Sequence, residues 1–167
     1  MVRLRDRRTA ILGGTSGIGL ATARALDERG ADVTIGSRDE RNLEHARESL
    51  SGRATAIQVD ATDRESLRNF FQVAGRIDDL VVTVTRRGGA GPAAELAEHD
   101  LTAAFAGKPT AHLQAVAEAL PTLDELGSVT LVSAGSAQGA LPGTALLAAV
   151  NGAIEAARWR ASSRRGG

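Results

Sequence analysis

Three glycines near the start of the chain, Gly13, Gly17 and Gly19, follow a short apolar run and open a stretch with helical spacing. Residues 11–19 read Ile-Leu-Gly-Gly-Thr-Ser-Gly-Ile-Gly, so the spacing is G-x-x-x-G-x-G. A side chain in such a turn would block the backbone from approaching phosphate groups, and one at the third glycine would hold the helix off the sheet. The helix start offers free N–H groups and a positive dipole end. The turn therefore predicts a strand–turn–helix unit that cradles a pyrophosphate, the alternative being a plain strand-to-helix connection.

Beyond this turn, short β-branched runs alternate with amphipathic stretches. Strands are expected at residues 9–12, 31–35, 54–59, 80–84 and 128–132. Helices are expected at 17–29, from the capping residue Asp39 to about 50, around 67–74, at 94–120 with a bend or break at Pro109, and at 143–160. The helix around 67–74 is expected to bury one stripe, formed by Leu67, Phe70, Phe71 and Ala74. The second half of the helix at 94–120 carries one apolar face, formed by Leu113, Val116, Ala117 and Leu120. The alternation predicts an α/β fold. It is a Rossmann-type, doubly wound parallel sheet of about five strands in the order 3-2-1-4-5, covered by helices on both faces. Ligand is expected in the crevice beyond strands 1 and 4.

The chain of 167 residues is expected to form a single domain over residues 1–160, followed by a flexible polar tail at 161–167. Twenty basic and twenty acidic side chains cancel, which argues against nucleic acid and membrane surfaces as partners. No apolar run reaches the length of a membrane span, and no signal-peptide pattern opens the chain, so a cytoplasmic location is expected. The absence of cysteine excludes disulfides and thiolate ligands. The three histidines, His45, His99 and His112, show no metal-ligand spacing, and we expect no metal site and surface or helix-side positions for them.

The glycine turn resembles the signature of the short-chain dehydrogenase/reductase family, and the resemblance continues through most of the chain. Residues 30–38, Gly-Ala-Asp-Val-Thr-Ile-Gly-Ser-Arg, are similar to the second strand of that family, and Val59-Asp60-Ala61 is similar to its adenine contact. The resemblance implies an oxidoreductase of carbonyl or alcohol substrates that binds NADP(H). The cofactor-binding positions that it implies are Gly13, Thr15, Ser16, Gly17, Ile18, Gly19, Arg38, Asp60, Ala61, Thr83 and Asn151.

Arg38 carries the choice of nucleotide. In NADPH-preferring members an arginine at this point faces the adenosine 2′-phosphate, which suits a planar guanidinium. An NAD-preferring site would want a carboxylate near Ser37, and Asp39 is a candidate. NADP is therefore favoured over NAD, although Arg38 also fits a solvated surface position. Asp60 fits either the adenine contact or a cap at the end of its strand.

The catalytic residues of the family are not matched. The stretch that aligns with the Asn-Asn-Ala-Gly of its fourth strand reads Val82-Thr83-Val84-Thr85, where backbone contacts to the cofactor can survive but the strand-stabilising role of the first asparagine cannot. In the family a tyrosine protonates the carbonyl and a lysine lowers the pKa of that tyrosine while holding the ribose. Leu147 and Asn151 stand at these two positions, and the chain contains no tyrosine.

Three residues are left as candidates for the remaining chemistry. Asn151 can still hydrogen-bond a ribose hydroxyl, and Ser133 can polarise a carbonyl if its strand end points into the crevice. Lys108, which aligns with the catalytic asparagine, is the candidate proton donor if burial lowers its pKa, the alternative being a lysine that reaches solvent ahead of Pro109. The candidate catalytic residues are thus Ser133 and Lys108.

The chain resembles the amino-terminal two-thirds of the family fold, so a truncated member is expected, with its fifth strand as an exposed edge. Family members often dimerise through the two helices expected near residues 100–120 and 143–160, which predicts a homodimer; packing of these helices on the sheet alone is the alternative. A non-catalytic NADP-binding, sensing or scaffold module and an inactive fragment remain as alternative functions. Arg86 and Arg87 fit either an anionic substrate or a solvated loop. The substrate itself is not predicted.

Overall fold

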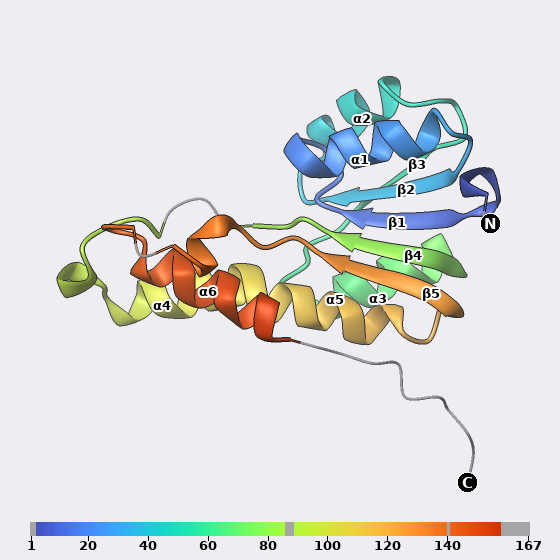
Figure 1. Ribbon diagram of the computed structural model, residues 1–167. Coiled ribbons are helices and arrows are strands. Elements are labelled where there is room, and N and C mark those ends of the chain that lie inside the picture. The colour runs from blue at the N-terminus through green and yellow to red at the C-terminus, as the bar shows by residue number, and fades with distance from the viewer. Residues whose placement is uncertain (1–2, 86–88, 140, 158–167) are drawn as a thin grey trace, which may run out of the picture.

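The computed structural model describes residues 3–85, 89–139 and 141–157. Its centre is a five-stranded parallel sheet in the order β3-β2-β1-β4-β5, as predicted (Figure 1). The strands are β1 (Arg8–Leu12), β2 (Asp32–Ser37), β3 (Thr55–Gln58), β4 (Ile77–Val82) and β5 (Leu123–Leu131). The helices are α1 (Gly17–Asp27), α2 (Glu40–Glu48), α3 (Arg64–Ala74), α4 (Glu98–Phe105), α5 (Ala111–Ala119) and α6 (Ala145–Ala156). The strand order reverses between β1 and β4, which puts the switch point of the sheet at the glycine turn.

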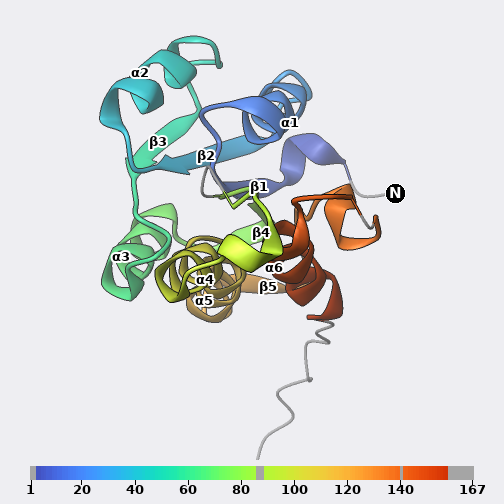
Figure 2. The ribbon, with the colours of Figure 1, turned by 90° about the vertical axis from the view of Figure 1, so that its left-hand side faces the viewer.

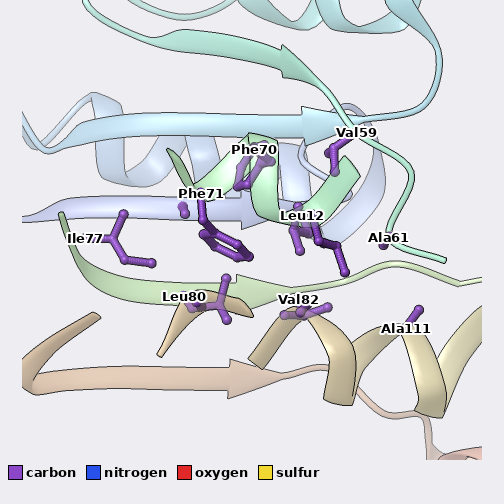
Figure 3. Close-up of a cluster of buried hydrophobic side chains, with 13 residues drawn as sticks. Leu12, Val59, Ala61, Phe70, Phe71, Ile77, Leu80, Val82 and Ala111 are labelled. Atoms are coloured by element: carbon purple, nitrogen blue, oxygen red, sulfur yellow. The ribbon is translucent and has the colours of Figure 1, made fainter. Parts of the chain in front are cut away.

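Two layers of apolar side chains separate the sheet from its helices, because successive residues of a strand face opposite sides. In β1, Ala10 and Leu12 face α3 and α5, whereas Ile11 faces α1 and α2. Phe70 and Phe71 of α3 fill the first layer, with their rings edge to face at a centroid distance of 5.1 Å (Figure 3). The helical spacing read from the sequence thus identified the residues that anchor α3 to the sheet.

The layers do not extend equally over the sheet. Figure 2 shows α1 and α2 on one side, and α3, α4, α5 and α6 on the other. The first pair packs on β1, β2 and β3. Along the far strand β5, Ser128 and Thr130 are exposed while Val129 and Leu131 pack against the layer under α5. Half of the sheet is therefore a three-layer structure, and the strand at its edge is covered on one face.

Strands β4 and β5 begin earlier than the apolar pattern predicted, at Ile77 rather than 80 and at Leu123 rather than 128. Charged side chains at both strand starts interrupt the apolar pattern. Asp79 of β4 accepts from Arg7 Nε at 2.8 Å and from Ser128 Oγ at 2.6 Å, and Arg8 pairs with Asp78. These pairs hold the amino ends of neighbouring strands together. Because their side chains are charged or polar, they interrupt the apolar run by which a strand is recognised in a sequence.

The segment predicted as one long helix at 94–120 is helical through Pro109, but not uniformly. A 3₁₀ turn at Ala93–Glu95 precedes α4, and a π-helical turn at Ala106–Thr110 joins α4 to α5. Proline lacks the N–H that an α-helix needs at this point, and a π turn is one way to absorb the missing bond. The last described helix, α6, ends at Ala156, and the part of the predicted helix beyond 157 lies outside the described residues, as does the tail at 161–167.

Among the described residues, no helix combines the length and the apolar character that a membrane crossing needs. Within the same part of the chain, no group of three or more His, Cys, Asp or Glu residues is placed to hold a metal ion.

Candidate functional site

A cleft of about 850 Å³ lies at the carboxyl ends of the strands, where the glycine turn and the segment joining α4 to α5 meet. Residues that follow β1, β2, β3, β4 and β5 all contribute to its lining. The positions predicted to bind cofactor line this cleft with one exception, Asn151, and the two candidate catalytic residues line it as well. The fold therefore gathers in one place residues that are up to 120 positions apart in the chain, Gly13 and Ser133 among them.

The glycine turn is packed too tightly for side chains. Gly13 has φ +85°, and its N–H donates to the carbonyl of Gly36 at 2.8 Å. A Cβ at Gly13 would lie 2.5 Å from Thr83 Oγ1, and a Cβ at Gly19 would lie 2.2 Å from the carbonyl oxygen of Gly13. Both glycines are thus required for the turn to fold against the start of α1, which leaves the backbone exposed to the cleft.

Thr83 ties the end of β4 to this turn. Its hydroxyl lies 3.0 Å from the carbonyl oxygen of Leu12 and 3.1 Å from that of Gly13, and its N–H donates to Leu12 at 2.9 Å. The sequence predicted that the strand-stabilising role of the family asparagine would be lost at this strand end. In the structure the side chain of Thr83, the residue after the one that aligns with this asparagine, supports the turn. No pattern in the sequence had indicated this contact.

The start of α1 is open toward the cleft. Ser16 occupies the N-cap position, yet its side chain makes no capping hydrogen bond to the helix, and Ile18 is 62% exposed. Thr15 Oγ1 donates to Ser37 Oγ at 3.2 Å. Because no side chain caps them, the first N–H groups of α1 can bind an anion at the positive end of the helix dipole. This turn fits the pyrophosphate of a dinucleotide.

The adenine end of the predicted site is formed by Arg38, which is exposed, and Asp60. Asp60 Oδ1 accepts from the N–H of Thr62 at 2.9 Å and from its hydroxyl at 2.7 Å. Partial burial opposes ionisation of this carboxyl, but the two hydrogen bonds and the charge of Arg38 outweigh it and lower its pKa. Asp60 is therefore an ionised cap of the turn that leads to α3. The N-cap of α3 itself is Asp63, so Asp60 caps the turn at the end of β3 and not the helix, and its adenine contact stays a prediction.

Ser133 lies at the end of β5 and its hydroxyl is 2.7 Å from Glu155 Oε1 of α6. Gln138 Nε2 donates to the other oxygen of the same carboxylate at 3.3 Å. A hydroxyl that donates its proton to a carboxylate has none to offer a substrate carbonyl, so Ser133 can polarise a carbonyl only after leaving Glu155. Sequence reasoning had not found Glu155, because a glutamate on a helix is usually solvated.

Lys108 and Asn151 are in direct contact. Lys108 Nζ donates to Asn151 Oδ1 at 2.6 Å, although the two residues are 43 positions apart. Lys108 is 9% exposed and Asn151 is 3% exposed, so the alternative of a lysine reaching solvent does not hold. Burial lowers the pKa of Lys108. Asn151, which was predicted to face the ribose, lies behind Lys108 and is not part of the cleft lining.

His112 is completely buried one helical turn beyond Lys108. Its Nε2 lies 2.9 Å from the carbonyl oxygen of Val84, and its Nδ1 is buried with no hydrogen-bond partner within the described part of the chain. Burial, together with the charge of Lys108, lowers the pKa of the imidazole despite its bond to Val84. Of the two expected positions, the surface one is wrong for His112, which lies on the buried side of α5, while His45 and His99 are exposed. Arg86 and Arg87 lie outside the described residues.

Comparisons with known proteins agree with this geometry. The family model described as short chain dehydrogenase matches residues 7–155. An uncharacterized oxidoreductase of Mycobacterium tuberculosis is 32% identical over 148 residues, which are 84% of this chain and 56% of that protein. A cis-4-hydroxycyclohexanecarboxylate dehydrogenase of Sinomonas cyclohexanicum is 38% identical over 101 residues, covering 59% of this chain and 41% of the relative. The chain thus spans about half the length of these curated relatives.

Solved structures show the same arrangement of elements. A short-chain dehydrogenase/reductase from Serratia marcescens superposes with a TM-score of 0.84 at 24% identity, which supports the fold alone. A short chain dehydrogenase from Burkholderia cenocepacia, solved in complex with NADP, has a TM-score of 0.79 at 30% identity. Each of these matches covers 92% of this chain and 66% of the solved chain.

Proposed function

Because the chain belongs to the short chain dehydrogenase family, we propose that it binds NADP(H) in the cleft and serves the interconversion of a carbonyl and an alcohol. The observation that carries this proposal is the continuity of the cleft from Arg38 and Asp60, past the uncapped start of α1, to Lys108 and Ser133. An extended dinucleotide needs such a sequence of a nucleoside site, a phosphate site and a second nucleoside site. A cytoplasmic location belongs to the same proposal.

NADP is favoured over NAD by the two residues that follow β2. Arg38 is exposed at the mouth of the cleft, where a guanidinium can pair with a phosphate. Asp39, the carboxylate that would suit NAD, accepts from the N–H of Asn42 at 3.0 Å and so caps α2. A ribose hydroxyl would have to compete with this helix cap. The NADP-bound Burkholderia protein is similar to this chain over the same region.

In the proposed reaction, NADPH when bound supplies hydride to the carbonyl carbon, and the chain supplies the proton and the electrostatic environment. Lys108 is the proposed proton donor, since burial lowers its pKa and it lines the cleft. Ser133 is the proposed polarising group, on condition that Glu155 releases it. A non-catalytic NADP-binding module is the second candidate, favoured by Leu147 at the position of the family tyrosine and by the lack of any tyrosine.

A homodimer through α4, α5 and α6 is part of the proposal. Leu101 and Phe105 of α4 and Leu113 of α5 are apolar side chains that are 41%, 39% and 50% exposed. Leu113 also lines an apolar groove of about 570 Å³ between α5, β5 and the end of α6. A second copy of the chain that packs against these helices would bury both features.

The proposal is tested by titrating the purified protein with NADPH and NADH while recording thermal unfolding. At a hundredfold excess over Kd, NADPH is expected to stabilise the fold by about 2–3 kcal/mol. Arg38→Ala is expected to reduce the affinity for NADPH and leave that for NADH nearly unchanged, since only NADPH carries the additional phosphate. No stabilisation by either nucleotide would refute the proposal. Turnover across a panel of ketones, aldehydes and alcohols separates the enzyme from the binding module, because the module binds NADPH without consuming it.

A further inference from the structure

The far end of the cleft contains a buried ammonium group held by an amide. Lys108 projects from the π-helical turn between α4 and α5, and its Nζ donates to Asn151 Oδ1 of α6 at 2.6 Å. Asn151 is itself fixed, because its Nδ2 donates to the carbonyl of Leu147 at 2.8 Å and lies 3.1 Å from Ser136 Oγ. With both of these bonds made through Nδ2, the amide oxygen is the atom that faces Lys108. The orientation of the pair is therefore determined by α6.

This ammonium has no counter-ion in the described part of the chain. The described ion pairs of the protein join other residues, and residues 1–2, 86–88, 140 and 158–167 include no Asp or Glu in the sequence. The neighbouring His112 donates from Nε2 to the carbonyl oxygen of Val84 and offers no negative charge. An ammonium has three donors, and Asn151 accepts from one of them. A buried cation in this state is costly unless a ligand supplies further acceptors.

The position of Lys108 in the cleft indicates which oxygen atoms of a ligand would accept hydrogen bonds from its ammonium group. Arg38 and Asp60 line one end, the uncapped start of α1 lines the middle, and Lys108 lines the other end together with Ser133 and Ala134. If the phosphates of a dinucleotide lie on the start of α1 and its adenosine on Arg38, the second nucleoside lies at Lys108. The ribose of that nucleoside carries two neighbouring hydroxyl oxygens, which are suitable acceptors for an ammonium.

We propose that Lys108 and Asn151 are an exchanged pair, in which Lys108 binds the nicotinamide-side ribose of the dinucleotide and Asn151 is the positioning residue that holds it there. The family that the sequence resembles has an asparagine where this chain has Lys108, and a lysine where this chain has Asn151. In this chain the two residue types are exchanged, and their side chains are in contact. In this proposal the ammonium comes from the turn between α4 and α5 instead of from α6. The inference rests on the proposed binding of NADP(H), which it deepens.

The test compares a whole nucleotide with its adenosine half. NADPH and adenosine 2′,5′-bisphosphate are titrated by calorimetry into the full chain and into the variants Lys108→Met and Arg38→Ala. Lys108→Met is expected to weaken the binding of NADPH on the order of ten- to a hundredfold, which is the usual contribution of a hydrogen bond to a charged group. The Kd of the bisphosphate is expected to stay within about twofold of its value for the unmodified chain. Arg38→Ala is the matched control and is expected to weaken both ligands.

Each outcome of this comparison has one meaning. If the unmodified chain binds neither ligand, the proposed function fails and the inference with it. If both ligands bind and Lys108→Met affects neither, the proposed function stands and Lys108 is not a ribose ligand. If Lys108→Met weakens both ligands equally, Lys108 acts through the fold, and the inference is wrong.

The exchange is tested by reversing it. Lys108→Asn places two amides in contact and is expected to fold but to bind NADPH as weakly as Lys108→Met. Asn151→Lys places two ammonium groups in contact and is expected to lower the melting temperature. The double variant Lys108→Asn/Asn151→Lys is expected to recover most of the NADPH affinity and of the melting temperature, because the ammonium–amide contact is restored. A folded double variant that binds NADPH no better than Lys108→Asn would overturn the exchange.

Discussion

His112 illustrates how a single residue can differ from what its type suggests. In the sequence it is a histidine on an expected helix with no metal-ligand spacing, and histidines are intermediate between core and surface residues in their burial. The side chain is instead fully buried under the end of β4, bonded to the carbonyl of Val84. Burial disfavours the charged imidazolium, which is why the pKa of His112 lies below its ordinary value.

We therefore expect the stability to fall below neutral pH in a way that depends on His112. An unfolded chain binds the proton near the ordinary pKa of about 6.5, whereas the folded chain resists it until lower pH. Between these two pKa values, acidification lowers the free energy of unfolding by up to about 1.4 kcal/mol per pH unit. Urea unfolding of the wild type and of His112→Gln, which retains a donor for Val84, at a series of pH values from 7.5 to 5 measures this (about 2.5 pH units in all).

The variant should lose less stability on acidification than the wild type. His99→Gln is the matched control, because it makes the same substitution at an exposed histidine. Equal slopes for all three proteins would show that the buried imidazole does not set the acid limit.

At the scale of elements, the sequence predicted those features that are encoded locally. The glycine turn, the cap at Asp39 and the spacing of Leu67, Phe70 and Phe71 each depend on residues a few positions apart. Two hydrogen bonds depend instead on segments that meet only in the folded chain. They are the bond from Thr83 to the glycine turn and the bond from Ser133 to Glu155. Side chains of these types are common on surfaces, so no local signal separates the structural ones from the rest.

The face of α5 shows the same limit. Leu113, Val116, Ala117 and Leu120 were identified as one apolar face, and they do share a groove. The side of α5 that packs on the sheet, however, is formed by smaller residues and His112. These are Ala111, His112, Ala115 and Ala119. Small residues let the helix approach the sheet closely, and hydrophobic periodicity gives greater weight to the larger side chains on the other side.

The glycine turn supplies a prediction at this scale. Gly19→Ala is expected to destabilise the fold by about 2–4 kcal/mol, because the added Cβ would lie 2.2 Å from a backbone oxygen that cannot move without opening the turn. Gly17→Ala, where nothing lies within 4 Å of a Cβ, is expected to cost about 1 kcal/mol for its φ of +50° alone. Denaturant unfolding measures both. Similar losses for the two variants would mean that the packing of the turn does not limit stability.

At the scale of the whole molecule, the sheet is built unevenly. Strands β3, β2 and β1 lie between two layers of helices, whereas β5 is an edge strand with one covered face (Figure 1). The strand order followed from the alternation of elements and was predicted correctly. The dimer through the helices near residues 100–120 and 143–160 stays a prediction, because an interface depends on which apolar side chains the fold leaves exposed.

We expect the protein to be a dimer in solution whose interface includes α5. Light scattering after size-exclusion chromatography should give twice the chain mass for the wild type and the chain mass for Leu113→Asp, since a carboxylate cannot be buried between two copies without a partner. Leu126→Asp is the control, because Leu126 is 88% exposed on β5 and does not line the groove beside α5. A monomeric wild type, or the loss of the dimer in Leu126→Asp as well, would contradict an interface at α5.

The buried ammonium of Lys108 also has a consequence for how long the protein persists in a cell. A buried ammonium that has one hydrogen-bond partner until a ligand supplies more makes the empty chain open more often than the loaded one, and proteases degrade the opened chain. The amount of protein at steady state would then follow the supply of nucleotide without any change in synthesis. Depletion of the nucleotide would then lower the level of the protein through a lysine that lies inside the fold rather than on its surface.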